Sequence, residues 1–124
     1  MEKKILSTTN APGAIGPYSQ GYEVNGFIFT SGQIPVVPED GTIPEGIKAQ
    51  TEISCKNVQA ILESAGVGMD AVIKTTCFLA DMGDFADFNQ VYAQYFVSKP
   101  ARSCVAVKEL PKGVLCEIDA VAVR

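Results

Sequence analysis

The sequence contains no histidine among its 124 residues. Histidine is the commonest general base near neutral pH and a frequent metal ligand. Its absence excludes Ser-His-Asp and Cys-His mechanisms. Any catalysis must therefore use carboxylates, lysine, tyrosine, cysteine, arginine or backbone groups.

Cysteine is scarce and unclustered. The chain has four cysteines, and no two of them have the C-x-x-C spacing of zinc or redox motifs. All four lie in apolar or periodic segments, which predicts four reduced thiols in the core. They are Cys55, Cys77, Cys104 and Cys116.

Long apolar runs and basic clusters are also missing. No run approaches the ~18 apolar residues of a membrane span, and residues 1–7 lack the apolar stretch of a signal peptide. We therefore expect a cytoplasmic protein with no membrane partner. Lys plus Arg number 10 and Asp plus Glu number 14, a net charge of −4. An acidic chain without a Lys/Arg cluster disfavours nucleic acid as a partner.

The length and pattern predict one domain over residues 1–124. Apolar residues at spacings of three and four predict a helix over 47–65, ended by Gly66. A second, aromatic-faced helix is expected between Asp84, as its N-cap, and Pro100, as its stop. Short β-rich segments predict six strands, at 4–7, 22–24, 27–31, 71–79, 102–109 and 115–123.

This order of elements predicts an α+β fold, in which one mixed sheet is covered on one face by two helices. Asn25-Gly26 predicts a tight hairpin between the second and third strands. Leu110-Pro111-Lys112-Gly113 predicts a turn that pairs the last two strands as an antiparallel hairpin. The strands carry apolar residues for both sheet faces, so the uncovered face should be buried against a neighbouring subunit.

Two charged residues of the last strands are candidates for chemistry. Glu117 lies within an apolar run, either on a solvated strand face or in a cleft. Arg102 and Arg124 are the only arginines beside eight lysines. Arg102 is therefore either a surface arginine or a two-pronged carboxylate binder, a task that suits the planar guanidinium.

The expected hairpin sets the relation between these two residues. If Glu109 pairs with Val114, Arg102 and Glu117 share a face but lie about 13 Å apart along the strands. A small acid would then bridge them only if the arginine leaned inward, the register differed, or another subunit completed the pocket. A one-residue slip would put them on opposite faces.

Three further sites have a functional and a simpler interpretation. Tyr18 either lines a pocket or packs over the sheet edge. Ser31-Gly32 either presents a hydroxyl and an open backbone N–H to a ligand or forms an ordinary strand exit. Cys104 could be a nucleophile, but no histidine is present to activate it.

Several motifs together resemble the reactive intermediate deaminases, the RidA (YjgF) family. The resemblance covers nearly the whole chain, and its most specific part places Arg102 and Glu117 on either side of the Leu-Pro-Lys-Gly turn. The motifs are Asn10-Ala11-Pro12, Ile15 to Gln20, Thr30 to Pro35, Gln50-Thr51, Asn89-x-x-Tyr92-x-x-Tyr95-Phe96 and Pro100 to Ile118.

The resemblance implies a chorismate-mutase-like fold (Bacillus type) and a homotrimer with three clefts between subunits. It implies hydrolysis of 2-iminobutanoate and 2-iminopropanoate to 2-keto acids and ammonia. Pyridoxal phosphate would belong to the dehydratases that release these imines, so no cofactor is expected here. Arg102 matches the family's carboxylate-binding arginine and Glu117 its water-activating glutamate. The other matched pocket positions are Tyr18, Ser31, Gly32 and Cys104, the last two through backbone groups.

The sequence thus leads to the hypothesis of an imine hydrolase that uses neither metal nor cofactor. In it, Arg102 holds the substrate carboxylate and Glu117 transfers protons. Two alternatives stay open: a regulatory protein that binds small carboxylates without turnover, and a ribonuclease or translation inhibitor.

Overall fold

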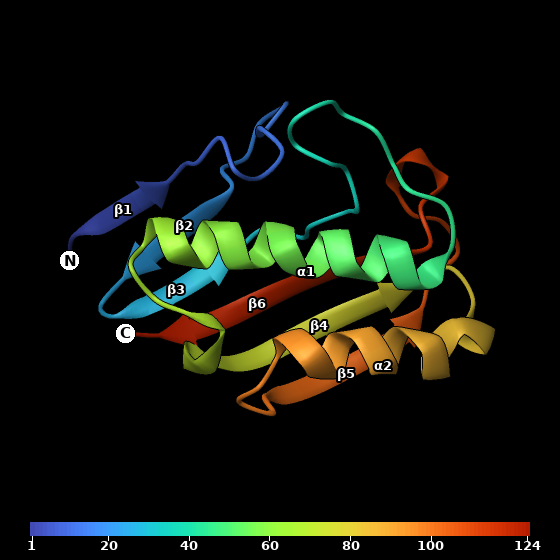
Figure 1. Cartoon of the computed structure of the whole chain (residues 1–124). Coiled ribbons are helices and arrows are strands. Elements are labelled where there is room, and N and C mark those ends of the chain that lie inside the picture. Colours follow the sequence, from blue (N-terminus) through green and yellow to red (C-terminus); the bar gives the residue numbers. More distant parts are fainter.

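The computed structural model describes residues 1–124 as six strands and two α-helices, as the sequence predicts (Figure 1). Short 3-10 turns precede β4 and α2 and lie between β5 and β6. The elements are β1 Lys3–Leu6, β2 Gly21–Val24, β3 Phe27–Thr30, α1 Ile47–Ser64, β4 Val72–Leu79, α2 Phe85–Tyr95, β5 Ala101–Ala106 and β6 Cys116–Val123.

All six strands form one mixed sheet in the order β1-β2-β3-β6-β4-β5. The predicted β2–β3 hairpin is confirmed, with Asn25 and Gly26 both at positive φ. The predicted hairpin of the last two strands is wrong. β4 lies between them, pairing parallel with β5 and antiparallel with β6. The physical reason is that α2 connects β4 to β5 as a crossover, and such a connection joins parallel strands.

Both helices cover the same face of the sheet, as expected (Figure 1). The core between them and the sheet is apolar, and on α2 it includes the stacked rings of Phe88, Tyr92 and Phe96. All four cysteines are free thiols, as predicted. Three are fully buried, whereas Cys104 is half-buried and packs at the border of the core.

The termini of the helices differ in part from the expectations. Gly66 follows α1 with φ of 82°, the left-handed conformation expected after a helix end. Asp84 occupies the N-cap of α2, but its side chain makes no capping hydrogen bond. The nearby Asp81 side chain instead accepts from the Gly83 N–H. α2 ends at Tyr95, well before Pro100, and Lys99 has φ of 52°.

The second face of the sheet is uncovered and apolar. Side chains from β1, β2, β3, β5 and β6 on this face are between 37% and 57% exposed: Ile5, Tyr22, Phe27, Phe29, Val105 and Val123. Such a continuous apolar surface is unusual for a monomer. The apolar character of both faces is thus as the sequence predicts, and burial of this face against a neighbouring subunit stays a prediction. No helix is both long and apolar enough to cross a membrane.

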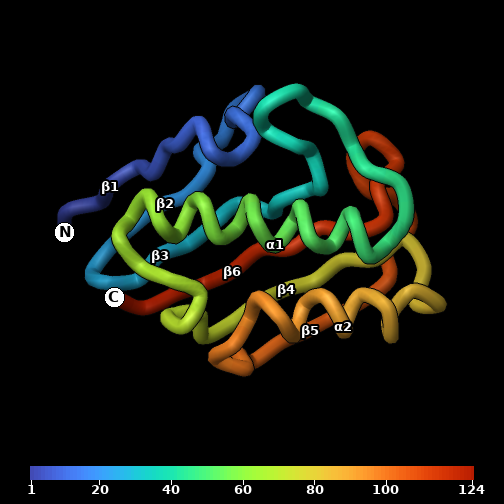
Figure 2. Tube along the Cα trace, in the orientation of Figure 1, coloured from blue at the N-terminus to red at the C-terminus, as the bar shows by residue number.

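Two loop segments rise above the same end of the fold (Figure 2). One is the segment between β1 and β2, and the other connects β3 to α1. They lie beside the end of β3 and the beginning of β6, where Gln33 and Ile118 form an isolated bridge. This arrangement brings the loop residues of the sequence motifs close to Glu117.

Candidate functional site

Arg102 lies on the helix-covered face of edge strand β5 and is held by α2. Its Nη1 donates a hydrogen bond to Oδ1 of Asn89 at 2.8 Å. Its guanidinium carbon lies 5.4 Å from the centre of the Phe85 ring and 4.8 Å from that of Tyr92. The Tyr92 hydroxyl is fixed in turn by a 2.7 Å hydrogen bond to the hydroxyl of Thr75. The guanidinium is thus held by cation–π contacts and one neutral acceptor.

The two arginines of the chain have different partners. Arg124 binds the Glu23 carboxylate with both prongs, through Nε at 2.9 Å and Nη2 at 3.0 Å. Arg102 is half-buried and makes no ion pair in the chain. A guanidinium has five N–H donors, and only one hydrogen bond, from Nη1 of Arg102 to Asn89, uses them within the protein. Arg102 therefore retains donors for an anion from outside the chain.

Glu117 lies on β6, where alternate residues face the uncovered side of the sheet. Its carboxylate packs against Gly32: a Cβ at that position would lie 2.1 Å from Glu117 Oε2. Only glycine can accommodate this contact, for steric rather than conformational reasons. Burial, and then the charge of Asp119, raise the pKa of Glu117 above its usual value of 4.5. A raised pKa of this kind is common among carboxylates that transfer protons, so Glu117 is a candidate for that role.

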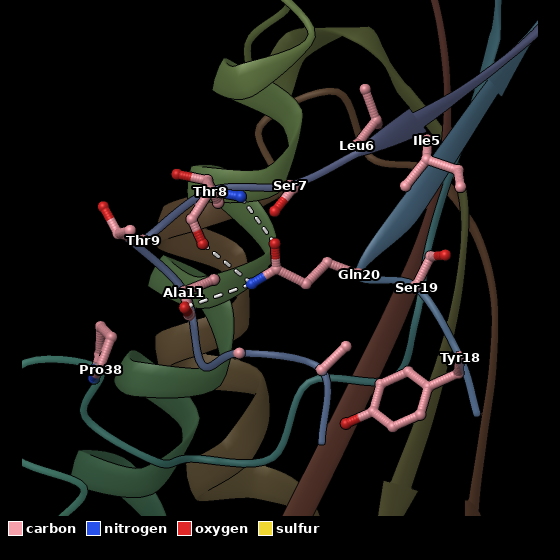
Figure 3. A pocket seen from close by; sticks show the side chains of 12 residues that line it. Ile5, Leu6, Ser7, Thr8, Thr9, Ala11, Tyr18, Ser19, Gln20 and Pro38 are labelled. Carbon is pink, nitrogen blue, oxygen red and sulfur yellow. Dashed lines mark hydrogen bonds between the residues drawn. The ribbon is translucent and has the colours of Figure 1, made fainter. Parts of the chain in front are cut away.

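Tyr18 lies beside the same site, on the loop between β1 and β2. Together with Gly32, Ile15 and Lys112 it lines a pocket of about 310 Å³. The loop is fixed from within by Gln20, which points back toward Thr8 and Ala11 (Figure 3).

The contacts of this glutamine are specific. Its carbonyl accepts from the Thr8 N–H at 2.7 Å, and its amide donates to the carbonyls of Thr8, Ala11 and Pro12. This role of Gln20 was not predicted from the sequence. It lies in the motif that ends Tyr18-Ser19-Gln20, but nothing in the sequence shows which backbone it holds.

Ser31 adjoins Gly32, and its hydroxyl donates to the Ser19 carbonyl at 2.5 Å. This leaves the oxygen of Ser31 as an acceptor only. Cys104 lies on β5 near Arg102 and opposite Cys77 in the strand register. Burial raises the pKa of the Cys104 thiol, although Arg102 opposes the shift. A protonated thiol is a poor nucleophile, so its side chain gains no support as a catalyst.

The backbone of Cys104 lies at the edge of the sheet. β5 is an edge strand of the sheet, so the polar backbone groups along its outer side have no partner strand in this chain. Such groups can bind a ligand or a second chain.

The predicted site residues thus form two groups. Tyr18, Ser31, Gly32 and Glu117 lie together around the end of β3. Arg102 and Cys104 lie on β5, two strands away from the strand β6 that carries Glu117. Arg102 is opposite Thr75 on the helix-covered face, whereas Glu117 is opposite Phe78 on the uncovered face. A single chain does not bring the arginine and the glutamate together.

Asn89, the hydrogen-bond partner of Arg102, was likewise not predicted from the sequence. The available signal was the spacing of Phe85, Asn89 and Tyr92, which is that of one helix face. Arg102 lies over that face because α2 connects β4 to β5 as a crossover and β5 is the edge strand of the sheet. The predicted hairpin of the last two strands did not contain this arrangement.

Comparison with known proteins assigns the chain to a family. A family model described as Endoribonuclease L-PSP matches residues 8–124. The chain is 49% identical to the 2-iminobutanoate/2-iminopropanoate deaminase of Escherichia coli (strain K12) and 48% identical to that of Salmonella typhimurium (strain LT2), in each case over 98% of both chains.

Solved structures support the same family assignment. The crystal structure of E. coli TdcF with bound serine matches with a TM-score of 0.94 and 50% identity, over 98% of each chain. That of the E. coli YjgF gene product matches with a TM-score of 0.95 and 48% identity, again over 98% of each chain. The chain therefore belongs to the Endoribonuclease L-PSP family, which is the family of RidA (YjgF) reactive intermediate deaminases that its motifs resemble.

Proposed function

We propose that this protein hydrolyses 2-imino acids such as 2-iminobutanoate and 2-iminopropanoate to 2-keto acids and ammonia. We further propose that it acts as a homotrimer, with each site in a cleft between two subunits. The relatives named as deaminases of these two imines support the reaction. The serine bound to TdcF, a small molecule with a carboxylate, supports the ligand class. A cytoplasmic location stays a prediction.

One observation carries the proposal: Arg102 has free donors and no acidic partner, while the desolvated Glu117 lies on the other face of the same sheet. β4 separates their strands. Residues so placed can act on one small molecule only if two copies of the chain each supply one of them. The exposed apolar face supports such association, because burying it would stabilise an assembly.

In the proposed reaction, Arg102 of one subunit binds the substrate carboxylate with two parallel hydrogen bonds. This holds the imine carbon beside a water molecule near Glu117 of the neighbouring subunit. Glu117 takes a proton from the water as the oxygen adds to the imine carbon. It returns that proton to the amine nitrogen and then takes the proton of the new hydroxyl group as the C–N bond breaks, so that the C=O bond of the keto acid forms and ammonia leaves. The proton on Glu117 then passes to ammonia, which restores the carboxylate. Atoms and charge balance with no further reactant.

The test couples the protein to a dehydratase that releases the imine, and measures keto acid and ammonia. The purified protein should accelerate their release, and Arg102→Ala should lose most of this acceleration. Arg124→Ala is the matched control, because this arginine already binds Glu23 and should leave activity unchanged. If Arg102→Ala hydrolyses the imine as fast as the parent, the proposed role of Arg102 is wrong.

The two alternatives have separate tests. Calorimetry with 2-oxobutanoate that shows binding, alongside no imine turnover, would favour a regulatory carboxylate-binding protein. The family description raises RNA cleavage as another activity. We disfavour it because the net charge is −4 and histidine is absent. Ribonuclease activity that follows the protein peak through extra purification would revive it.

A further inference from the structure

Helix α2 presents three side chains to the guanidinium of Arg102: Phe85, Asn89 and Tyr92. They are four and three residues apart, so they share one face of the helix. We call these three residues the α2 cradle. The deaminase reaction as described above uses Arg102 but assigns nothing to the residues that hold it.

The members of the cradle constrain the guanidinium in different ways. The two rings attract its charge, but a cation–π contact tolerates sliding and rotation of the group over the ring. A hydrogen bond is directional, and the one from Nη1 to Asn89 Oδ1 is 2.8 Å long. Asn89 is therefore the member that fixes which N–H groups of Arg102 point away from α2.

The chemistry of the acceptor is equally important. At Arg124 the partner is a carboxylate, which occupies both prongs of the fork. At Arg102 the partner is a neutral amide, which uses a single N–H and leaves the positive charge uncompensated. A neutral acceptor can thus orient the fork without competing with an anionic ligand.

We infer that Asn89 is a positioning residue, which orients Arg102 so that its free N–H groups can donate to the substrate carboxylate. This inference rests on the proposed function and deepens it. Because Asn89 acts on carboxylate binding rather than on proton transfer, its loss should weaken binding and spare the chemical step.

The first test replaces the acceptor. Asn89→Leu has a similar volume and no acceptor, so the KM for the imine and the Kd for 2-oxobutanoate should each rise about tenfold, while kcat changes less than about twofold. Gln90→Leu is the matched control. It removes the amide of the next, exposed residue of α2, and should behave as the parent. Asn89→Ala gives the same comparison if thermal unfolding shows that leucine disturbs the packing.

The second test restores an acceptor but adds a charge. Asn89→Asp should bind 2-oxobutanoate more weakly than the parent at neutral pH, because its carboxylate occupies the fork. The difference in affinity for 2-oxobutanoate between variant and parent should shrink as the pH is lowered, because the new carboxyl is then protonated. A residue that only stabilised the fold would not produce this pH dependence.

The outcomes separate the inference from the function on which it rests. If the parent protein neither hydrolyses the imine nor binds 2-oxobutanoate, the proposed function fails. If the parent does both and Asn89→Leu retains its KM and Kd, only the role of Asn89 is overturned. A change confined to kcat would overturn it as well.

Discussion

The surroundings of Arg102 and Glu117 are built in opposite ways. Arg102 is held by side chains of α2, two aromatic rings and an amide, on the covered face of the sheet. Glu117 has no such support. It lies on the uncovered face against a glycine and beside another carboxylate, and its pKa is raised. The surroundings of Arg102 stabilise its positive charge without pairing it with an anion. The surroundings of Glu117 raise its pKa, so its negative charge is more easily removed by protonation.

Under the proposed function, this difference lets one small sheet provide a binding group and a proton-transfer group that do not pair within the chain. If the two lay together in one chain, they would form an ion pair, and that would lower the pKa of the glutamate. Their positions on opposite faces leave both side chains without an ion-pair partner in the chain, as the proposed site between two subunits requires. The following predictions test this division of roles.

The largest effect is expected from Glu117→Gln. It should lower kcat by roughly 100-fold or more, because proton transfer by a positioned group contributes at least that factor. Binding of 2-oxobutanoate, measured by calorimetry, should stay near the parental value. Burial raises the pKa of Glu117, so the fold loses stability as the pH rises from the unfolded-state pKa of this carboxyl, and the loss is complete above its raised folded-state pKa. The variant should therefore be at least as stable as the parent at neutral pH.

Arg102→Lys should show the opposite kinetic pattern. A lysine retains the charge but not the two parallel donors. We expect KM and the Kd for 2-oxobutanoate to rise roughly 10- to 100-fold, because one charge-assisted hydrogen bond is lost. Steady-state kinetics and calorimetry would check this. A variant with parental KM would show that charge alone suffices.

Gly32→Ala should reduce kcat about tenfold, because the added Cβ would meet Glu117 Oε2 at 2.1 Å and displace the carboxylate. Gly13→Ala is the control, since its added methyl would meet no atom within 4 Å. Equal activity of the two variants would mean that the position of the Glu117 carboxylate is unimportant.

The smallest effect concerns pH. If ionised Glu117 is the base, kcat/KM should decline as the pH falls through its raised pKa, above 4.5. Asp119→Asn removes a negative charge that contributes to this shift. The acid limb of the pH profile should then move to lower pH. An unmoved limb would argue that burial alone sets the pKa of Glu117.

Local patterns predicted the elements of this fold because each depends on neighbours in the sequence. The positive φ of Asn25 and Gly26 and the α1 stripe ending before Gly66 are examples. Strand adjacency does not depend on neighbours. A Leu-Pro-Lys-Gly turn suggested a hairpin, but the helix between β4 and β5 required those strands to be parallel neighbours, which moved β6 to the centre of the sheet.

The site was predictable to the same degree. The sequence motifs named candidate residues that the structure places in two groups, and completion of the pocket by another subunit was one of three options that the expected register left open. The separation of Arg102 and Glu117 onto opposite faces follows from the true register. Asn89 could not be assigned, because its contact with Arg102 is set by how α2 packs on the sheet.

The most direct test of the two-chain site mixes two inactive variants, Arg102→Ala and Glu117→Gln, under conditions in which subunits exchange. In an equal mixture half of the arginines and half of the glutamates are intact, so about a quarter of the inter-subunit clefts should be complete. Imine hydrolysis should recover to about that fraction of the parental rate. If exchange is verified and the mixture stays as inactive as its components, Arg102 and Glu117 do not act together across an interface.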